Sequence, residues 1–189
     1  MFETPAMSQR MTVRNDTFHP VTFQVKKGGM VIARTPAIGH GAAVQIPTSE
    51  AYTVEATTVI DGNTYTSAPI SFFGAACFVA GVLQIESQGT YQFEMVQASP
   101  RSADHLEFEN TTRAPVTFIL SHAGIWLHAV VARDAFDTVS IPLTGGYTVY
   151  AVINGITTDL LQTDDPDAVI AARVGPGGAE AGDFELAIV

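Results

Sequence analysis

Residues 20–25 read Pro-Val-Thr-Phe-Gln-Val, and residues 115–120, which follow 95 positions later, read Pro-Val-Thr-Phe-Ile-Leu. The likeness extends without a gap over residues 11–58 and 106–153, and the run Tyr-Thr-Val also occurs in both segments. Self-similarity at a fixed spacing is the sequence mark of a repeated structural unit. The sequence therefore predicts two related units within one chain.

Both copies alternate apolar and polar side chains along the run that repeats. In the first copy a threonine separates Val21 from Phe23, and in the second copy a threonine separates Val116 from Phe118. Alternation with a period of two is the pattern of a β-strand that buries one face. We therefore expect these four apolar side chains to point into hydrophobic cores.

Turn signals at matching places separate the β-rich runs of both copies. Asp61-Gly62 and Asn154-Gly155 favour two-residue hairpin turns, because these residue types tolerate positive φ. Proline ends a strand in each copy, since it cannot donate to a ladder of hydrogen bonds. The predicted fold class is all-β: two tandem antiparallel β-sandwich units that arose by internal duplication and pack with pseudo-two-fold symmetry.

The repeat also predicts where the domains begin and end. Residues 1–10 precede the first strand pattern and are expected to form a disordered leader. The first β-sandwich repeat is expected at 11–97 and the second at 106–189. Residues 98–105, which read Ala-Ser-Pro-Arg-Ser-Ala-Asp-His, are the expected linker because they are rich in proline, serine and charge.

The composition limits the partners that this chain can have. Hydrophobic residues make up 47% of the 189 residues, charged residues make up 15%, and the net charge is −10. The high apolar content favours an inter-domain or oligomer face that buries surface beyond two small cores. Because phosphate backbones and anionic bilayers repel negative charge, nucleic acid is not expected as a partner, and a membrane is not favoured.

Cysteine usage and the first residues bear on the compartment. Cys77 is the single cysteine, so an internal disulfide is not expected, as is typical of a reducing compartment. The first residues lack the basic and apolar regions of a secretory signal. The predicted localisation is therefore cytoplasmic, or outside the cell after export without a conventional signal peptide.

One strand of the second copy carries residues suited to ligand binding. Trp126 and His128 are expected on the face opposite the core, with His122 on the preceding turn. An outward tryptophan flanked by imidazoles can stack on a sugar ring or lie beside a bound metal. The alternative is that Trp126 packs against the other unit or another subunit, because tryptophan is common in interfaces. Two histidines alone do not complete a metal site.

The second copy also carries four aspartates close together in the sequence. Such carboxylates could bind calcium, the only cofactor that the sequence suggests. Their spacing is not that of an EF-hand loop, and a solvated acidic loop is the simpler interpretation. The four residues are Asp159, Asp164, Asp165 and Asp167.

The segment 70–85 is much more apolar than its counterpart in the second copy, which contains Asp-Asp-Pro-Asp. We expect protein to cover this segment as core or subunit interface, because water does not tolerate so much contiguous apolar surface. Insertion into a membrane is the alternative. The side chains that would make either contact are Phe72, Phe73, Phe78 and Val82.

The sequence gives little support to catalysis. The chain has no Gly-x-Ser-x-Gly motif, and Cys77 lies among apolar residues, which raise the pKa of a thiol. We therefore expect a non-enzymatic binding or assembly protein whose partner is a glycan, another protein or further copies of itself. A membrane-active subunit similar to pore-forming toxins is the first alternative, and a divergent enzyme is the second.

Overall fold

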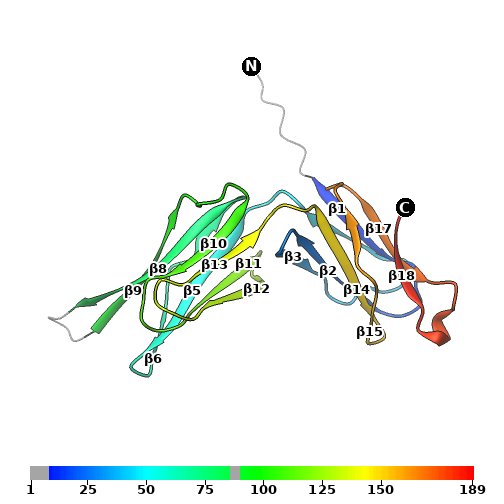
Figure 1. Cartoon of the computed structure of the whole chain (residues 1–189). Coiled ribbons are helices and arrows are strands. Elements are labelled where there is room, and N and C mark those ends of the chain that lie inside the picture. Colours follow the sequence, from blue (N-terminus) through cyan, green and yellow to red (C-terminus); the bar gives the residue numbers. More distant parts are fainter. Residues whose placement is uncertain (1–8, 86–89) are drawn as a thin grey trace, which may run out of the picture. The chain divides into compact units, whose positions relative to one another are not determined.

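The computed structural model describes residues 9–85 and 90–189, which form an all-β protein (Figure 1). Apart from a short 3-10 helix at Ala179–Ala181, the regular structure in these residues consists of strands. Within the same residues, no helix has the length and apolar character that crossing a membrane requires. The strands are β1 (Arg10–Asn15), β2 (Val21–Lys27), β3 (Met30–Arg34), β4 (Ala43–Pro47), β5 (Tyr52–Ile60), β6 (Asn63–Thr66), β7 (Ile70–Phe72), β8 (Ala76–Ile85), β9 (Thr90–Ala98), β10 (His105–Asn110), β11 (Val116–His122), β12 (Ile125–Ala132), β13 (Thr138–Pro142), β14 (Tyr147–Ile153), β15 (Ile156–Thr157), β16 (Leu161–Thr163), β17 (Val169–Val174) and β18 (Phe184–Ile188).

The strands gather in two compact units. Unit 1 comprises the described residues up to Glu50 together with Gly145–Val189, and unit 2 comprises Ala51–Thr144. Each unit therefore takes strands from both copies of the repeat. The chain passes from one unit to the other in the short connections after β4 and after β13.

These units correct the domain boundaries that the repeat predicts. The predicted domains were 11–97 and 106–189, whereas the observed divisions follow Glu50 and Thr144. The predicted linker 98–105 lies inside unit 2, where it joins β9 to β10. Of the predicted leader, residues 1–8 lie outside the described residues, and Arg10 already belongs to β1.

Unit 1 contains a four-stranded and a five-stranded sheet. The four-stranded sheet has the order β18-β17-β1-β4, and β1 pairs in parallel with β17 from Thr12↔Val169 to Asn15↔Ala172. The five-stranded sheet has the order β15-β14-β2-β3, and β16 pairs with a second stretch of β14. In both sheets, the central pair joins one strand from each copy of the repeat.

Unit 2 also contains a four-stranded and a five-stranded sheet. The four-stranded sheet has the order β13-β10-β8-β9, with β10 parallel to β8 from Leu106↔Ala76 to Asn110↔Ala80. The five-stranded sheet has the order β12-β11-β5-β6, and β7 pairs with a second stretch of β5. The central pairs again join one strand from each copy.

The sheets confirm a β-sandwich-like, all-β architecture and correct one detail of it. The predicted antiparallel arrangement is wrong for the pairs β1 with β17 and β8 with β10, which are parallel. Strands that are adjacent in sequence and joined by a tight turn must run antiparallel. These two pairs are free of that constraint, because β1 lies far from β17 in the chain and β8 and β10 have β9 between them.

Two-residue hairpin turns form where the sequence predicts them. Asp61 and Gly62 have φ values of 50° and 79°, and Asn154 and Gly155 have φ values of 51° and 78°. Positive φ at both central residues is the geometry of a type I′ turn. The turns connect β5 to β6 and β14 to β15, so both hairpin predictions are confirmed.

The side chains that alternate in β2 and β11 point into the cores, as predicted. Val21, Val116 and Phe118 are fully buried, and Phe23 is 2% exposed. In unit 2, rings from several strands pack one against the next. The ring centroid of Phe108 lies 5.8 Å from that of Phe78 and 5.2 Å from that of Phe118. The core of unit 2 is therefore built around aromatic side chains.

A buried asparagine ends the first strand of each copy and orders the next loop. The Asn110 side-chain nitrogen donates to the carbonyl oxygens of Ala114 (2.9 Å) and Ala132 (3.2 Å), and its oxygen accepts from the Thr112 nitrogen (2.8 Å). Asn15 makes the same three kinds of bond in unit 1. Because buried amides are costly unless they are paired, these residues fix both loops firmly.

The apolar segment 70–85 is covered by protein along only part of its length. Phe72 and Phe78 are buried in the core of unit 2, where their rings lie 5.0 Å apart. Phe73, in the turn between β7 and β8, is 68% exposed, and Val82 is half-buried. Phe72 and Phe78 are therefore core residues, and for Phe73 the contact with a second subunit or a membrane stays a prediction.

Candidate functional site

Long hairpins at one end of unit 2 build the candidate site. β5 and β6 have nine and four residues, whereas β14 and β15, at the corresponding place in unit 1, have seven and two. β8 has ten residues, and its counterpart β17 has six. Because β10 pairs with β8 only up to Ala80, the rest of the β8–β9 hairpin continues beyond the sheet.

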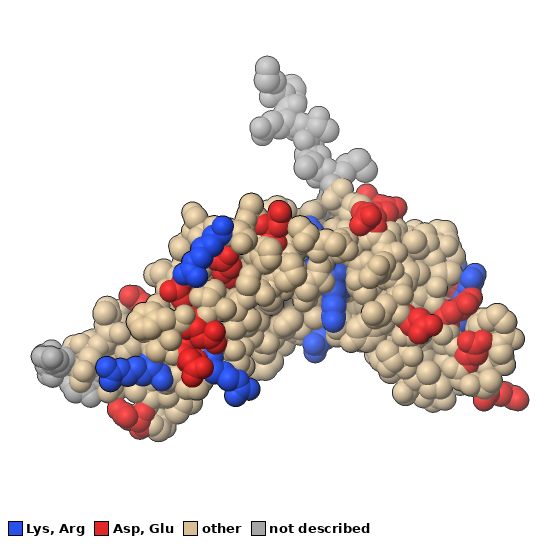
Figure 2. All heavy atoms as spheres, viewed as in Figure 1, with Lys and Arg blue, Asp and Glu red and all other residues tan. Residues whose placement is uncertain are grey.

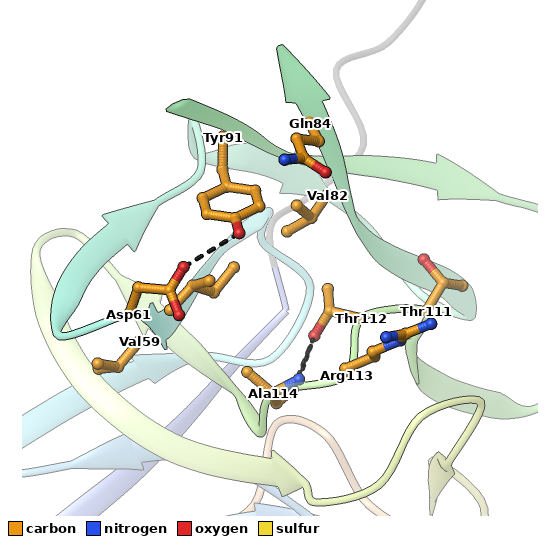
Figure 3. Close-up of a pocket in the computed structure, with 10 residues that line it drawn as sticks. Val59, Asp61, Val82, Gln84, Tyr91, Thr111, Thr112, Arg113 and Ala114 are labelled. Carbon is orange, nitrogen blue, oxygen red and sulfur yellow. Dashed lines mark hydrogen bonds between the residues drawn. The ribbon is translucent and has the colours of Figure 1, made fainter. Parts of the chain in front are cut away.

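The extended hairpins enclose a pocket with a volume of about 620 Å³ (Figure 3). One wall comes from the end of β5 and its turn, a second from β8 and β9, and the third from the loop between β10 and β11. A volume of this size suits a small ligand. The residues that line the pocket are Val59, Ile60, Asp61, Val82, Gln84, Tyr91, Thr111, Thr112, Arg113 and Ala114.

A hydrogen bond joins the two hairpins at the rim of the pocket. The Tyr91 hydroxyl on β9 donates to an Asp61 carboxylate oxygen at 3.0 Å, and the Tyr91 ring packs edge-on against Tyr65 of β6. The bond to Asp61 raises the pKa of Tyr91, because the nearby carboxylate disfavours the phenolate. Asp61 keeps a second carboxylate oxygen that can accept a hydrogen bond from a ligand.

The loop after β10 supplies the opposite wall. The Thr111 hydroxyl donates to the Ala80 carbonyl oxygen at 2.8 Å, and the Thr112 hydroxyl accepts from the Ala114 nitrogen at 3.2 Å. These bonds hold the loop against β8. In Figure 3, Thr111 and Arg113 are drawn on the side of the pocket away from Asp61. The pocket thus has a carboxylate on one side and a guanidinium on the other.

The corresponding end of unit 1 is arranged differently. The connection between β17 and β18 folds back on itself, with the Asp183 carboxylate accepting from the Gly177 nitrogen at 2.6 Å. Gly182 packs so closely on Ile156 of β15 that a Cβ at this position would collide with it. The loop therefore contacts the short β14–β15 hairpin at Ile156, although both residues of β15 remain exposed, whereas the β8–β9 hairpin of unit 2 remains extended.

The residues proposed for ligand binding from the sequence lie in a different part of unit 2. Trp126 is 69% exposed on β12, and His128 is half-buried on the same strand. His122 ends β11, where its Nδ1 lies 3.2 Å from the Ala51 carbonyl oxygen. A bulge at Leu127 interrupts the alternation of β12, and Ile125 is 53% exposed beside Trp126.

Two of the four aspartates suggested as calcium ligands accept hydrogen bonds from backbone nitrogens of unit 1. Asp165 accepts from the Asp167 nitrogen at 2.9 Å, and Asp167 accepts from the Arg10 nitrogen at 2.8 Å. Asp159 lies between β15 and β16, and Asp164 follows β16 in the connection to β17. Among the described residues, no group of three or more His, Cys, Asp or Glu side chains is placed to hold a metal ion.

Sequence reasoning missed the pocket residues, although one signal pointed to them. Asp61 was interpreted only as a turn residue, and neither Tyr91 nor Arg113 drew attention. The two copies differ in length between the YTV run and the following strands, which indicates longer hairpins in one unit. This difference in hairpin length between the copies is therefore the sequence signal that points to this end of unit 2.

The chain matches no protein-family model, and no curated protein or solved structure was found to be similar to it.

A buried carboxylate in β10, close to the predicted linker 98–105, makes the stability of the protein depend on pH in a testable way. Glu107 is only 3% exposed and accepts from the backbone nitrogens of Arg101 (2.9 Å) and Ser102 (3.0 Å). These bonds hold the pKa of Glu107 below its ordinary value of 4.5, and the bond from Arg101 has the largest effect. The stability that they provide is complete above the ordinary pKa and is lost as the pH falls through the lowered pKa.

We expect Glu107→Gln to lower the melting temperature by a few degrees at pH 7, with the difference from wild type shrinking below about pH 4. Thermal unfolding between about pH 3 and pH 7 measures this, and Glu94→Gln, at an exposed position of β9, is the matched control. A difference that stays constant across this range would show that the charge of Glu107 has no role in stability.

Proposed function

We propose that this chain is a non-enzymatic binding protein and that the end pocket of unit 2 binds a saccharide. The aliphatic side chains of Val59 and Val82, with the Tyr91 ring, offer apolar surface to the C–H face of a sugar ring. The Asp61 carboxylate and the Gln84 amide can hydrogen-bond its hydroxyl groups. Apolar walls with a few polar groups are typical of small-ligand sites.

The hydrogen bond between the Tyr91 hydroxyl and the Asp61 carboxylate is the single observation that carries this proposal. It joins two hairpins that are longer in unit 2 than in unit 1, and it faces a pocket, whereas at the same end of unit 1 the β17–β18 connection folds back on itself. Binding residues commonly lie on loops that a rigid scaffold positions. The difference between the units supports a role for this end beyond stability.

We also propose that the repeat records an internal duplication whose two copies exchanged strands and then diverged. Matching strand orders in the two units and the asparagine bonds common to both support a shared origin. In this proposal unit 1 keeps the structural role and unit 2 gained the pocket. A pseudo-two-fold relation between the copies stays a prediction.

Screening on an array of immobilised glycans tests the saccharide proposal. We expect the wild-type chain to bind a restricted set of glycans, and Tyr91→Ala and the near-isosteric Asp61→Asn each to reduce binding about tenfold or more. Tyr150→Ala is the matched control, because Tyr150 lines a smaller groove on unit 1. Equal binding by all four proteins would place the site elsewhere.

Light scattering over a range of concentrations accompanies the array. If the array shows no bound glycan while the mass rises with concentration, the saccharide proposal is wrong and self-assembly takes its place.

A further inference from the structure

We propose that the pocket selects acidic saccharides and that Arg113 binds their carboxylate. The inference rests on the saccharide-binding function proposed above and names the class of sugar. It makes Arg113 the residue that determines specificity, while Asp61, on the opposite side of the pocket, binds the sugar hydroxyls (Figure 3).

Arg113 differs from the arginines that stabilise the fold. Arg14, Arg101 and Arg173 each form an ion pair with a carboxylate at 2.7 Å. Arg113 is exposed, lines the pocket and has no ion-pair partner among the described residues. A guanidinium can bind a carboxylate through two parallel hydrogen bonds, which suits a ligand that supplies the missing anion.

The position of Arg113 in the repeat adds a second observation. Ninety-five residues earlier the first copy has Phe18, which stacks on His40 with the ring centroids 4.7 Å apart. The loop backbone is the same in both units, because Asn15 and Asn110 hold it by equivalent bonds. The arginine therefore belongs to the unit that has the pocket and is not required by the loop itself.

The charges on the two sides of the pocket fix the orientation of an acidic sugar. The Asp61 carboxylate repels a negative group and accepts hydrogen bonds from hydroxyls, whereas Arg113 attracts a carboxylate. The wider surface does not supply this attraction, because the net charge is −10 and acidic side chains are interspersed with the basic ones on the face that Figure 2 shows. Binding of the anion should therefore depend on this one guanidinium.

Matched pairs of acidic and neutral sugars test the inference by calorimetric titration. The pairs are methyl glucuronide with methyl glucoside and methyl galacturonide with methyl galactoside, which differ only at the carboxylate. We expect the acid of at least one pair to bind wild type about tenfold more tightly than its neutral partner. Arg113→Gln should remove this difference by lowering the affinity for the acid, and added salt should weaken only the acid.

Two further variants separate the possible failures. Arg133→Gln is the control for a change of net charge, because Arg133 is exposed and lies outside the lining of the pocket. Asp61→Asn should weaken the neutral and acidic sugars alike. Equal affinities of acid and neutral sugar for wild type would overturn the acidic selectivity and leave saccharide binding intact. If no sugar of the four binds at millimolar concentration, the proposed function is overturned with it.

Discussion

Phe118→Ala should lower the free energy of unfolding of unit 2 by about 3–5 kcal/mol, the usual cost of removing a fully buried phenylalanine ring. The Phe118 side chain is completely buried on β11, and its ring lies 5.2 Å from that of Phe108. Phe108 in turn packs on Phe78. Alanine would leave a cavity among rings that cannot collapse to fill it.

Cys77 allows the effect on unit 2 to be measured. It is the single cysteine of the chain, it is 4% exposed, and burial raises the pKa of its thiol. Reaction with a thiol reagent therefore requires unit 2 to open. If opening and closing are fast, Phe118→Ala should accelerate labelling by roughly two to four orders of magnitude. Phe73→Ala, at an exposed position, is the matched control. An unchanged labelling rate in Phe118→Ala would contradict the proposed packing.

Cleavage of the chain between Ser102 and Ala103 should leave both fragments bound together under native conditions. A recognition sequence for a specific protease can be inserted there, because both residues are exposed in the loop between β9 and β10. Each fragment contributes central strands to both units. The ladders that hold the fragments together join β1 with β17, β2 with β14, β5 with β11 and β8 with β10.

Size-exclusion chromatography of the cleaved protein measures this association. We expect one species with the mass of the intact chain down to nanomolar concentration, and two fragments only in denaturant. The uncut protein with the same insertion is the control for the insertion itself. Two separate fragments in native buffer would show that each copy folds on its own, as the repeat alone predicts.

The sequence predicts the strands well because its local signals are physical. Alternation placed Val116 and Phe118 in a core, and Asp-Gly and Asn-Gly dipeptides placed two hairpin turns. The partners of the strands were not predictable in the same way. β5 could pair with β2 of its own copy or with β11 of the other, because both strands carry the pattern Val-Thr-Phe. A repeat shows which segments are equivalent and leaves open which copy each segment pairs with.

The sequence also did not predict which residues of β8 and β17 are equivalent. The ends of the two copies are most alike at a spacing of 91 residues, as in Phe93-Glu94 and Phe184-Glu185, and this spacing aligns Phe78 with Val169. The parallel ladders instead set Cys77 opposite Glu107 and Val169 opposite Thr12. Since Glu107 and Thr12 are equivalent in the repeat, Cys77 corresponds to Val169, one residue from the sequence alignment. Phe78 pairs with Gln97 and Ile170 pairs with Ile188, so β9 and β18 are equivalent at a spacing of 91 residues, as the sequence comparison aligns them.

The candidate site was hidden from sequence reasoning because its residues come from separate segments. Asp61, Tyr91 and Arg113 lie at least twenty residues apart, so no spacing rule relates them. The groups that spacing did suggest lie close in sequence. Of these, Trp126 is exposed outside the lining of the pocket, and Asp165 and Asp167 accept hydrogen bonds from backbone nitrogens of unit 1.

Amide chemical shifts recorded during titration with methyl glucuronide test most directly whether the end pocket of unit 2 is the binding site. We predict that the shifts change along 59–61, 82–84 and 111–114 and at Tyr91, and that Arg113→Gln reduces these changes. Shift changes centred on Trp126 or on the groove beside Tyr150 in unit 1, with the pocket amides unmoved, would contradict the assignment of the site.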